Sequence, residues 1–198
     1  MEAKKETGAH RRSGLNHADS IEESVNVRSL RERDSEGTTG APWARPTGFA
    51  LLQIAKIALR DLSLDLDAIR DWGAAAVVTL VEPKELIMLR VEHLGDEVLR
   101  RGMSWFHLPI VDVSTPSEAF ERQWDVAGNE LRTLLRNSRD VLVHCRGGLG
   151  RAGTIAARLL VELGTEPQTA IRQVRAARPG AIETPEQERY VLGMRVVT

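Results

Sequence analysis

The octapeptide His-Cys-Arg-Gly-Gly-Leu-Gly-Arg, at residues 144–151, lies between a short apolar run and a segment with helical spacing. Three of its residues are glycines, which can take positive φ angles and turn successive backbone N–H groups toward one point. A helix that begins just beyond such a loop directs the positive end of its dipole at the same point. We therefore expect an oxyanion-binding loop between a buried strand and a helix, with Gly147, Gly148 and Gly150 at positive φ.

This loop begins with the one cysteine of the chain, Cys145, and ends with Arg151. A thiol beside a guanidinium and a nest of N–H groups is expected to be a thiolate at neutral pH, and a thiolate is a nucleophile. The fork of donors on Arg151 can curl back across the loop and hold two oxygen atoms of one phosphoryl group. The expected phosphate-binding set is Arg146, Gly147, Gly148, Leu149, Gly150 and Arg151.

Apolar runs typical of buried strands alternate with segments of helical spacing over most of the chain. This alternation predicts an α/β fold with a single, mostly parallel sheet covered by helices on both faces. The expected strands are 48–58, 74–81, 104–110 and 140–145. The expected helices are 65–72, one or two within 82–102, 117–136, 154–164, one that begins at Pro167 and one that a capping box opens at Thr184.

Residues 1–46 differ in composition from the rest of the chain. They carry charges of both signs with Gly, Ser and Thr, and their few aliphatic residues follow no sustained period. Such a segment buries too little apolar surface to fold alone, so we expect a disordered tail. A short helix over residues 21–33 is the alternative, because Ile21, Val25 and Val27 form one weak face. The globular domain is then expected to span residues 47–198.

Charge and hydropathy exclude several classes of protein. The 27 Lys and Arg against 28 Asp and Glu leave a net charge of -1, so we expect no binding to nucleic acid. No uncharged stretch, residues 72–81 included, is longer than ten residues, half of the about 20 that a membrane-spanning helix needs. We expect a cytoplasmic protein without a membrane span. A single cysteine excludes an intramolecular disulfide and multi-cysteine zinc sites, and no metal or cofactor is expected.

The string HCRGGLGR contains a Cys-x5-Arg motif and resembles the signature of the protein tyrosine phosphatase superfamily. The amino-acid sequence of this motif is similar to that of the dual-specificity branch, and it most resembles the kinase-associated phosphatases of the cyclin-dependent-kinase-inhibitor type. The likeness extends over residues 62–196 and includes the strings DLDAIRDWGAAAVVTLVE, PIVDVSTPS and ARPGAIETPEQERYV. The resemblance implies the cysteine-based phosphatase fold, and it implies that residues 47–198 form a cysteine-dependent phosphatase domain.

The resemblance also implies a phosphomonoester hydrolase with a two-step mechanism. Cys145 attacks the phosphorus to form a thiophosphoryl enzyme, and water then releases phosphate. In this family an aspartate on a loop after an earlier strand protonates the leaving oxygen, and Asp112 matches it, 33 positions before Cys145. The apolar neighbours Val111 and Val113 would favour the protonated carboxyl if the loop closed over the substrate. The alternative role of Asp112 is to cap a turn before Pro116.

Supporting residues follow from the same resemblance. His144 matches a histidine that orients the loop through hydrogen bonds. The family usually carries a Ser or Thr hydroxyl directly after the arginine to support departure of the thiolate, but this chain has Ala152 there. Thr154 could substitute if the turn brings it back toward the sulfur. Gln187 resembles a glutamine that positions water, although its place in the capping box is a sufficient structural reason for it.

Other activities fit parts of the pattern. A catalytically silent phosphate-binding module would retain the loop, but nucleophile, arginine and acid are all present here. A rhodanese-type sulfurtransferase shares the anion nest and a Cys-Arg pair such as Cys145-Arg146, but its loop is shorter. Arsenate reduction also uses the nest, yet it would need an external thiol because Cys145 has no partner cysteine.

The expected substrate is a phosphorylated protein or a small phosphoester, and the sequence does not choose between them. Enzymes strict for phosphotyrosine usually wall a deep slot with an aromatic side chain, and the one tyrosine, Tyr190, lies in the last predicted helix. A shallow dual-specificity pocket is therefore expected. Arg146 adds a cation at the rim, so a phosphoinositide or a small phosphorylated metabolite is the alternative substrate. The sequence predicts no particular oligomeric state.

Overall fold

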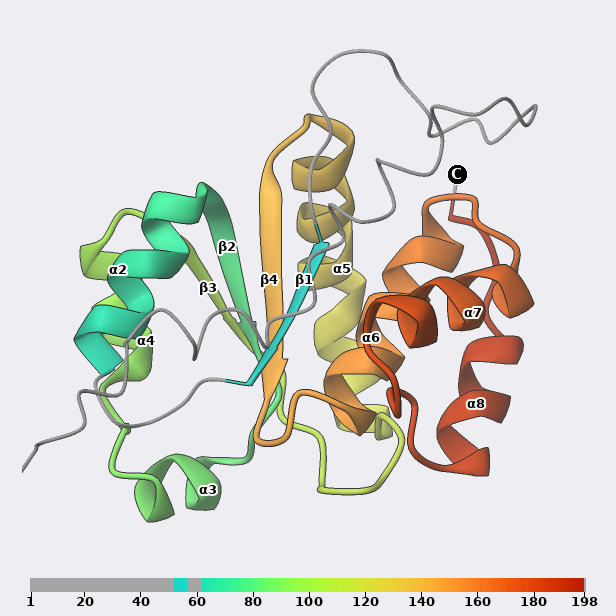
Figure 1. Ribbon diagram of the computed structural model, residues 1–198, viewed down its shortest axis with the longest axis horizontal. Helices are drawn as coiled ribbons and strands as arrows, with labels where there is room; N and C mark the ends of the chain where they lie inside the picture. The colour runs from blue at the N-terminus through green and yellow to red at the C-terminus, as the bar shows by residue number, and fades with distance from the viewer. Residues whose placement is uncertain (1–51, 57–61, 198) are drawn as a thin grey trace, which may run out of the picture.

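The computed structural model describes residues 52–56 and 62–197, which form a sheet with helices on both of its faces (Figure 1). The strands in this part of the chain are β1 (Leu52–Lys56), β2 (Ala74–Thr79), β3 (Ser104–His107) and β4 (Asp140–Cys145). Their order in the sheet is β1-β4-β2-β3, and each neighbouring pair is parallel. The predicted α/β fold with a mostly parallel sheet is confirmed.

The predicted tail at residues 1–46 and its alternative helix at 21–33 lie outside the described residues. The same holds for residues 48–51 and 57–58 of the first predicted strand. Within the described ranges, no helix has both the length and the hydropathy needed to cross a bilayer. The same ranges hold no group of three or more His, Cys, Asp or Glu side chains placed to bind a metal ion.

The helices of the described residues are α2 (Leu62–Trp72), α3 (Pro83–Met88), α4 (Leu94–Arg100), α5 (Glu118–Arg136), α6 (Gly150–Glu162), α7 (Pro167–Ala177) and α8 (Pro185–Leu192). In Figure 1, α2 and α4 lie on one side of the sheet and α5 and α6 on the other, where α7 and α8 pack against α6. The charged segment that follows β2 therefore holds two short helices, α3 and α4, as predicted.

Helix α5 follows its predicted period closely. The hydroxyl of Ser117 accepts a hydrogen bond from the amide of Phe120 at 3.3 Å, so this residue is the predicted N-cap. Phe120, Trp124 and Leu131 are buried on the side that faces the sheet and α6. The stripe of apolar residues at steps of three and four thus holds α5 against the core.

The boundaries beside the octapeptide differ from the predicted ones. β2 ends at Thr79 and β3 at His107, although backbone bonds continue for a few residues, as from Ile110 N–H to the carbonyl oxygen of Leu80 at 3.0 Å. The prediction that the next helix begins at residue 154 is wrong. It begins at Gly150, because the loop runs directly into helical backbone. Arg151 therefore lies in the first helical turn, where the helix fixes its direction.

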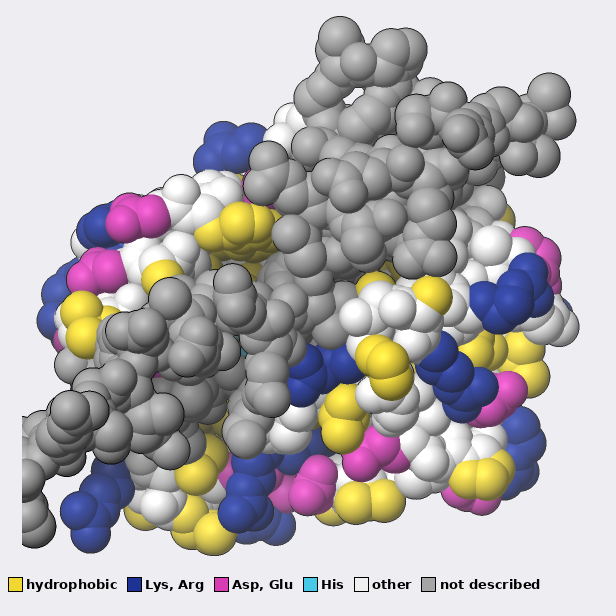
Figure 2. Space-filling model, in the orientation of Figure 1, with side chains coloured by type: hydrophobic (Ala, Val, Ile, Leu, Met, Phe, Trp, Pro, Cys, Tyr) yellow, Lys and Arg dark blue, Asp and Glu magenta, His cyan; other side chains and the backbone are white. Residues whose placement is uncertain are grey.

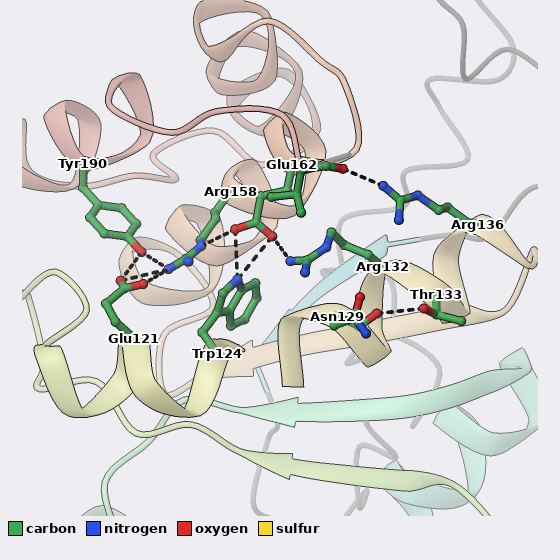
Figure 3. Close-up of polar contacts among 10 residues, drawn as sticks. Glu121, Trp124, Asn129, Arg132, Thr133, Arg136, Arg158, Glu162 and Tyr190 are labelled. Carbon is green, nitrogen blue, oxygen red and sulfur yellow. Dashed lines mark hydrogen bonds and ion pairs between the residues drawn. The ribbon is translucent and has the colours of Figure 1, made fainter. Parts of the chain in front are cut away.

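A buried network of charged and aromatic side chains joins α5, α6 and α8 (Figure 3). The Glu162 carboxylate accepts hydrogen bonds from Arg132 at 2.5 Å, from Arg158 at 2.7 Å and from the Trp124 indole at 2.9 Å. Arg158 also contacts the hydroxyl of Tyr190, and its guanidinium lies 4.6 Å from the centre of the Trp124 ring. Because a buried charge is stable only when it is paired, this network holds α6 against α5 and α8.

Candidate active site

Cys145 is the last residue of β4 and is buried at the edge where the parallel strands end. Its sulfur accepts a hydrogen bond from the amide of Gly148 at 3.2 Å. The chain therefore curls around the sulfur, and the last seven residues of the octapeptide form a compact loop, called here the phosphate loop (residues 145–151). This geometry places the thiol within hydrogen-bond reach of one backbone amide of the loop, and the predicted nest of several amides stays a prediction.

The glycines of this loop have different physical roles. Gly148 has a φ of 66°, which an L side chain rarely adopts. Gly147 and Gly150 lack positive φ, so that part of the prediction is wrong. A Cβ atom at Gly150 would lie 2.2 Å from the Glu183 carboxylate and 3.0 Å from the Gln187 amide. Gly150 is therefore needed for close packing against the segment before α8.

Arg151 is only 2% exposed, and its guanidinium is held by a carboxylate that sequence reasoning missed. Glu85 binds it bidentately, with Nη1 to Oε2 at 2.6 Å and Nη2 to Oε1 at 3.0 Å. Nη1 also donates to the carbonyl oxygen of Ile110 at 3.1 Å. Nε is buried and has no hydrogen-bond partner in the structure. A buried donor without a partner is unfavourable, so Nε is the group that an oxyanion in the loop would satisfy.

Charge interactions hold both Arg151 and Glu85 ionised. Burial alone would raise the pKa of Glu85, but hydrogen bonds from Arg151 and from the backbone of Glu82 outweigh it and lower that pKa. Burial would lower the pKa of Arg151, but the hydrogen bond to Glu85 and the nearby charges of Cys145, Glu85 and Asp112 raise it. The guanidinium therefore remains a fixed cation beside the sulfur.

Glu85 lies in the first turn of α3 and also accepts the amide of Glu82 at 2.8 Å. The signal that could have found it is a carboxylate shortly after a buried strand. Carboxyl ends of parallel strands meet at one edge, which brings residues after β2 close to residues after β4. Another missed residue is Arg178, whose Nη2 donates to the carbonyl oxygen of Gly147 at 3.2 Å and so braces the phosphate loop from outside.

Asp112 lies on the segment between β3 and α5, called here the acid loop (residues 110–115). Its Oδ1 atom is 2.9 Å from Nη2 of Arg151, so the structure brings the predicted acid to the phosphate loop. Its side chain is 57% exposed, and Val111 and Val113 are also exposed. In this loop conformation these valines do not form the expected apolar surroundings. Val113 has a φ of 60°, a strained value for a β-branched residue.

His144 is buried, and its Nε2 atom lies 2.8 Å from the hydroxyl oxygen of Thr79. Burial lowers the pKa of His144 to about 3, against a hydrogen bond with the Cys145 backbone that favours the protonated ring. The imidazole is therefore neutral, and it connects the residue before the phosphate loop to β2. This position fits the orienting role implied by the resemblance.

The other predicted supporting side chains bind backbone atoms. The Thr154 hydroxyl donates to the carbonyl oxygen of Gly150 at 2.7 Å, so its proton does not point to the sulfur. Gln187 accepts the amide of Glu183 at 2.9 Å and donates to the carbonyl oxygen of Ser114 at 3.2 Å. Gln187 therefore connects the start of α8 to the acid loop, and both the oxygen and the nitrogen of its side-chain amide have backbone partners.

Charges around the site are mixed in sign. Arg146 is exposed, and Asp112 and Glu183 are exposed near the loop. Figure 2 shows basic, acidic and hydrophobic side chains side by side along the lower edge of the visible face, the edge at which the loops after the strands lie in Figure 1. Recognition of an anion at this edge therefore depends on the phosphate loop and Arg151, as the low net charge indicates.

A parallel sheet that ends in a Cys-x5-Arg loop, with the arginine paired to a carboxylate, defines the class of cysteine-based phosphatases. The family model described as "PTP-SAK: Swiss Army Knife protein, DSP-PTPase phosphatase domain" matches residues 52–191. The chain belongs to this family of dual-specificity and tyrosine phosphatase domains.

Relatives and solved structures are similar over the same region. The chain is 36% identical over 135 residues to cyclin-dependent kinase inhibitor 3 of Rattus norvegicus, and 34% identical over 140 residues to that of Homo sapiens. Each match covers 67% of this chain and 62% of the relative. The kinase-associated phosphatase (KAP) with its catalytic-site cysteine changed to serine has 28% identity and a TM-score of 0.64, over 74% of this chain and 94% of that one.

The active form of Tk-PTP gives a similar result, with 32% identity and a TM-score of 0.58 over 74% of this chain and 94% of that one. The predicted resemblance to dual-specificity phosphatases, and to the kinase-associated type in particular, is thereby confirmed.

The role of Glu85 can be tested by Glu85→Gln. The neutral amide of Gln has one oxygen and no negative charge, so it cannot hold both nitrogens of Arg151 as Glu85 does. The guanidinium should then shift from its place in the site, and binding of orthovanadate should weaken about 100-fold. Isothermal titration calorimetry measures the change. The matched control is Glu92→Gln, because Glu92 is exposed and belongs to the same region of the chain. Equal vanadate affinity in both variants would contradict the role given to Glu85.

Proposed function

We propose that residues 47–198 form a cysteine-dependent phosphomonoester hydrolase, a protein phosphatase of the dual-specificity type. The observation that carries this proposal is the buried Arg151 Nε donor, which has no partner, on a guanidinium that interacts electrostatically with Cys145. Membership of the dual-specificity phosphatase family supports the same activity. It also counts against the sulfurtransferase, the arsenate reductase and the silent binding module.

In the first step, Cys145 attacks the phosphorus and a P–S bond forms while the P–O bond breaks. The electron pair of that bond goes to the leaving oxygen, which takes a proton from Asp112. The backbone amides of the loop and Arg151 hold the oxygen atoms of the transferring group. Oδ1 of Asp112 lies 2.9 Å from Nη2 of Arg151, so a bound phosphoryl group competes with Asp112 for this donor. Binding of substrate thus displaces the Asp112 carboxylate, which takes up a proton from solvent before it faces the leaving oxygen.

In the second step, water attacks the phosphorus of the thiophosphoryl group and gives a proton to the Asp112 carboxylate. The P–S bond breaks, its electron pair goes to the sulfur, and the Cys145 thiolate and free phosphate are released. The chain has Ala152 where the family usually carries a hydroxyl, and the Thr154 hydroxyl already donates to Gly150. The departing sulfur then has the amide of Gly148 as its hydrogen-bond donor. We infer that this second step is slow relative to the first.

A phosphorylated protein is the proposed substrate. Tyr190 lies on α8, and its hydroxyl binds Glu121 of α5 at 2.8 Å and contacts Arg158 of α6, so its side chain is engaged in this network and not at the phosphate loop. This placement supports a shallow pocket open to phosphoserine, phosphothreonine and phosphotyrosine. The exposed Arg146 side chain favours the second candidate, a phosphoinositide or a phosphorylated metabolite. A cytoplasmic location and the lack of nucleic-acid binding stay predictions from charge and hydropathy.

The proposal is tested first by Cys145→Ser. This variant should keep less than about one hundredth of the wild-type rate with an aryl phosphate, since losing the nucleophile raises the barrier by more than about 2.7 kcal/mol. Steady-state kinetics measure the rate, and vanadate binding is the control that the loop is intact. A serine variant with near-normal turnover would rule out the covalent mechanism.

The acid is tested by Asp112→Asn. Hydrolysis of a phosphoserine peptide, whose leaving group is poor, should slow by about 10²–10⁴, because its oxygen needs the proton. An aryl phosphate with a good leaving group should slow much less. Asp125→Asn is the control, since Asp125 is an exposed carboxylate on α5. Equal slowing of both substrates would assign the acid elsewhere.

The slow second step predicts a burst. Rapid mixing of the wild type with an aryl phosphate should release about one equivalent of the phenol per enzyme before a slower steady rate. Ala152→Ser should speed the steady phase and shrink the burst, because its hydroxyl supports departure of the thiolate. Thr154→Val is the control and should leave the burst unchanged. A wild type without a burst would show that formation of the intermediate limits turnover.

A further inference from the structure

We propose that Trp105 and Thr79 are positioning residues, which act through His144 to hold Cys145 in place for reaction. They form a chain of hydrogen bonds that crosses three neighbouring strands, from the edge strand β3 through β2 to β4. The inference rests on the proposed function, because it assigns a second set of residues to the same nucleophile.

The chain of hydrogen bonds is continuous. The indole Nε1 of Trp105 lies 2.9 Å from the Thr79 hydroxyl oxygen, and that oxygen lies 2.8 Å from Nε2 of His144. Thr79 is opposite His144 in the parallel register of β2 and β4 and is fully buried. His144 is followed directly by Cys145, with whose backbone its ring interacts. Each link is short enough for a direct hydrogen bond without water.

The donors and acceptors fix one direction along this chain. An indole N–H can only donate, so the Thr79 oxygen accepts from Trp105. The bond between the His144 ring and the Cys145 backbone favours a proton on the ring, so the N–H of the neutral ring is used there and the Thr79 proton is left for Nε2. Nε2 of His144 is then the acceptor, and the neutral ring carries its proton on Nδ1. That N–H is the group available to the backbone of Cys145. The two outer residues therefore select the tautomer that binds the phosphate loop.

Packing holds Trp105 in the orientation that this chain requires. Its ring stacks on His107, with centroids 5.2 Å apart, and His107 lies 2.9 Å from the carbonyl oxygen of Val81 through Nε2. The indole also packs closely against Gly95 of α4, where an added Cβ atom would lie 2.3 Å from the ring. The indole therefore fits only because α4 has a glycine there. Such packing directs the N–H inward from an edge strand.

Loss of the Thr79 hydroxyl would leave Nε2 of His144 buried without a donor. Either tautomer would then leave Nε2 without a partner, so the ring would gain from rotation toward another polar group, and its bond to the Cys145 backbone would be lost. Because chemistry at the sulfur depends on placement within about 1 Å, kcat should fall while binding of the phosphoryl group changes little.

The test compares Thr79→Val, which keeps the shape, with Thr79→Ser, which keeps the hydroxyl. With an aryl phosphate, Thr79→Val should lower kcat about 10–100-fold and leave KM nearly unchanged, and Thr79→Ser should restore most of the rate. Trp105→Phe should lower kcat too. The matched control is Trp72→Phe, because Trp72 is a half-buried tryptophan on α2, and this substitution should leave kcat unchanged. Equal losses in the Val and Ser variants would overturn the proposal.

Nitrogen NMR of the His144 imidazole gives a second readout that needs no activity. The wild type should show the Nδ1-protonated tautomer with Nε2 accepting a hydrogen bond, and Thr79→Val should lose that signature. An unchanged tautomer in Thr79→Val and Trp105→Phe would overturn the relay. If the wild type hydrolysed no phosphoester, the proposed function would fail, while the NMR comparison would still decide whether these residues set the state of His144.

Discussion

The site depends on the buried ion pair between Arg151 and Glu85. A guanidinium that is almost wholly removed from water is stable only beside a matching carboxylate, and Glu85 binds two of its nitrogens. This pairing joins α3, which follows β2, to α6, which follows β4. It leaves the buried Nε without a hydrogen-bond partner, so the pair holds the cation in place and keeps one donor open.

The same arginine also organises the acid loop. Nη1 binds the carbonyl oxygen of Ile110 and Nη2 binds Asp112, while Gln187 binds the carbonyl oxygen of Ser114 from the other side. The loop is therefore anchored at both ends, with the strained Val113 backbone between them. An oxyanion that takes the Arg151 donor changes the partner of Asp112, which links binding to the placement of the acid.

Helix α6 gives this arrangement a rigid base. It is buried along nearly its whole length between the sheet and α7 and α8, and the Glu162 network joins its far end to α5 (Figure 3). On the sheet side, the chain of hydrogen bonds from Trp105 to His144 supports the residue before the loop. The phosphate loop is thus held at both of its ends by buried polar contacts, which is what a preorganised anion site requires.

The sequence by itself determined what is local. The strand, glycine loop and helix around Cys145 follow from neighbouring residues, and the helix from Glu118 to Arg136 follows from its apolar period and from Ser117 at its start. The tertiary structure decided the partners. Glu85, Thr79 and Trp105 lie 40 or more positions before the residues of the loop that they support, and the strand order β1-β4-β2-β3 brings them there. Local patterns encode which segments become strands, but the order of strands depends on packing of the whole chain.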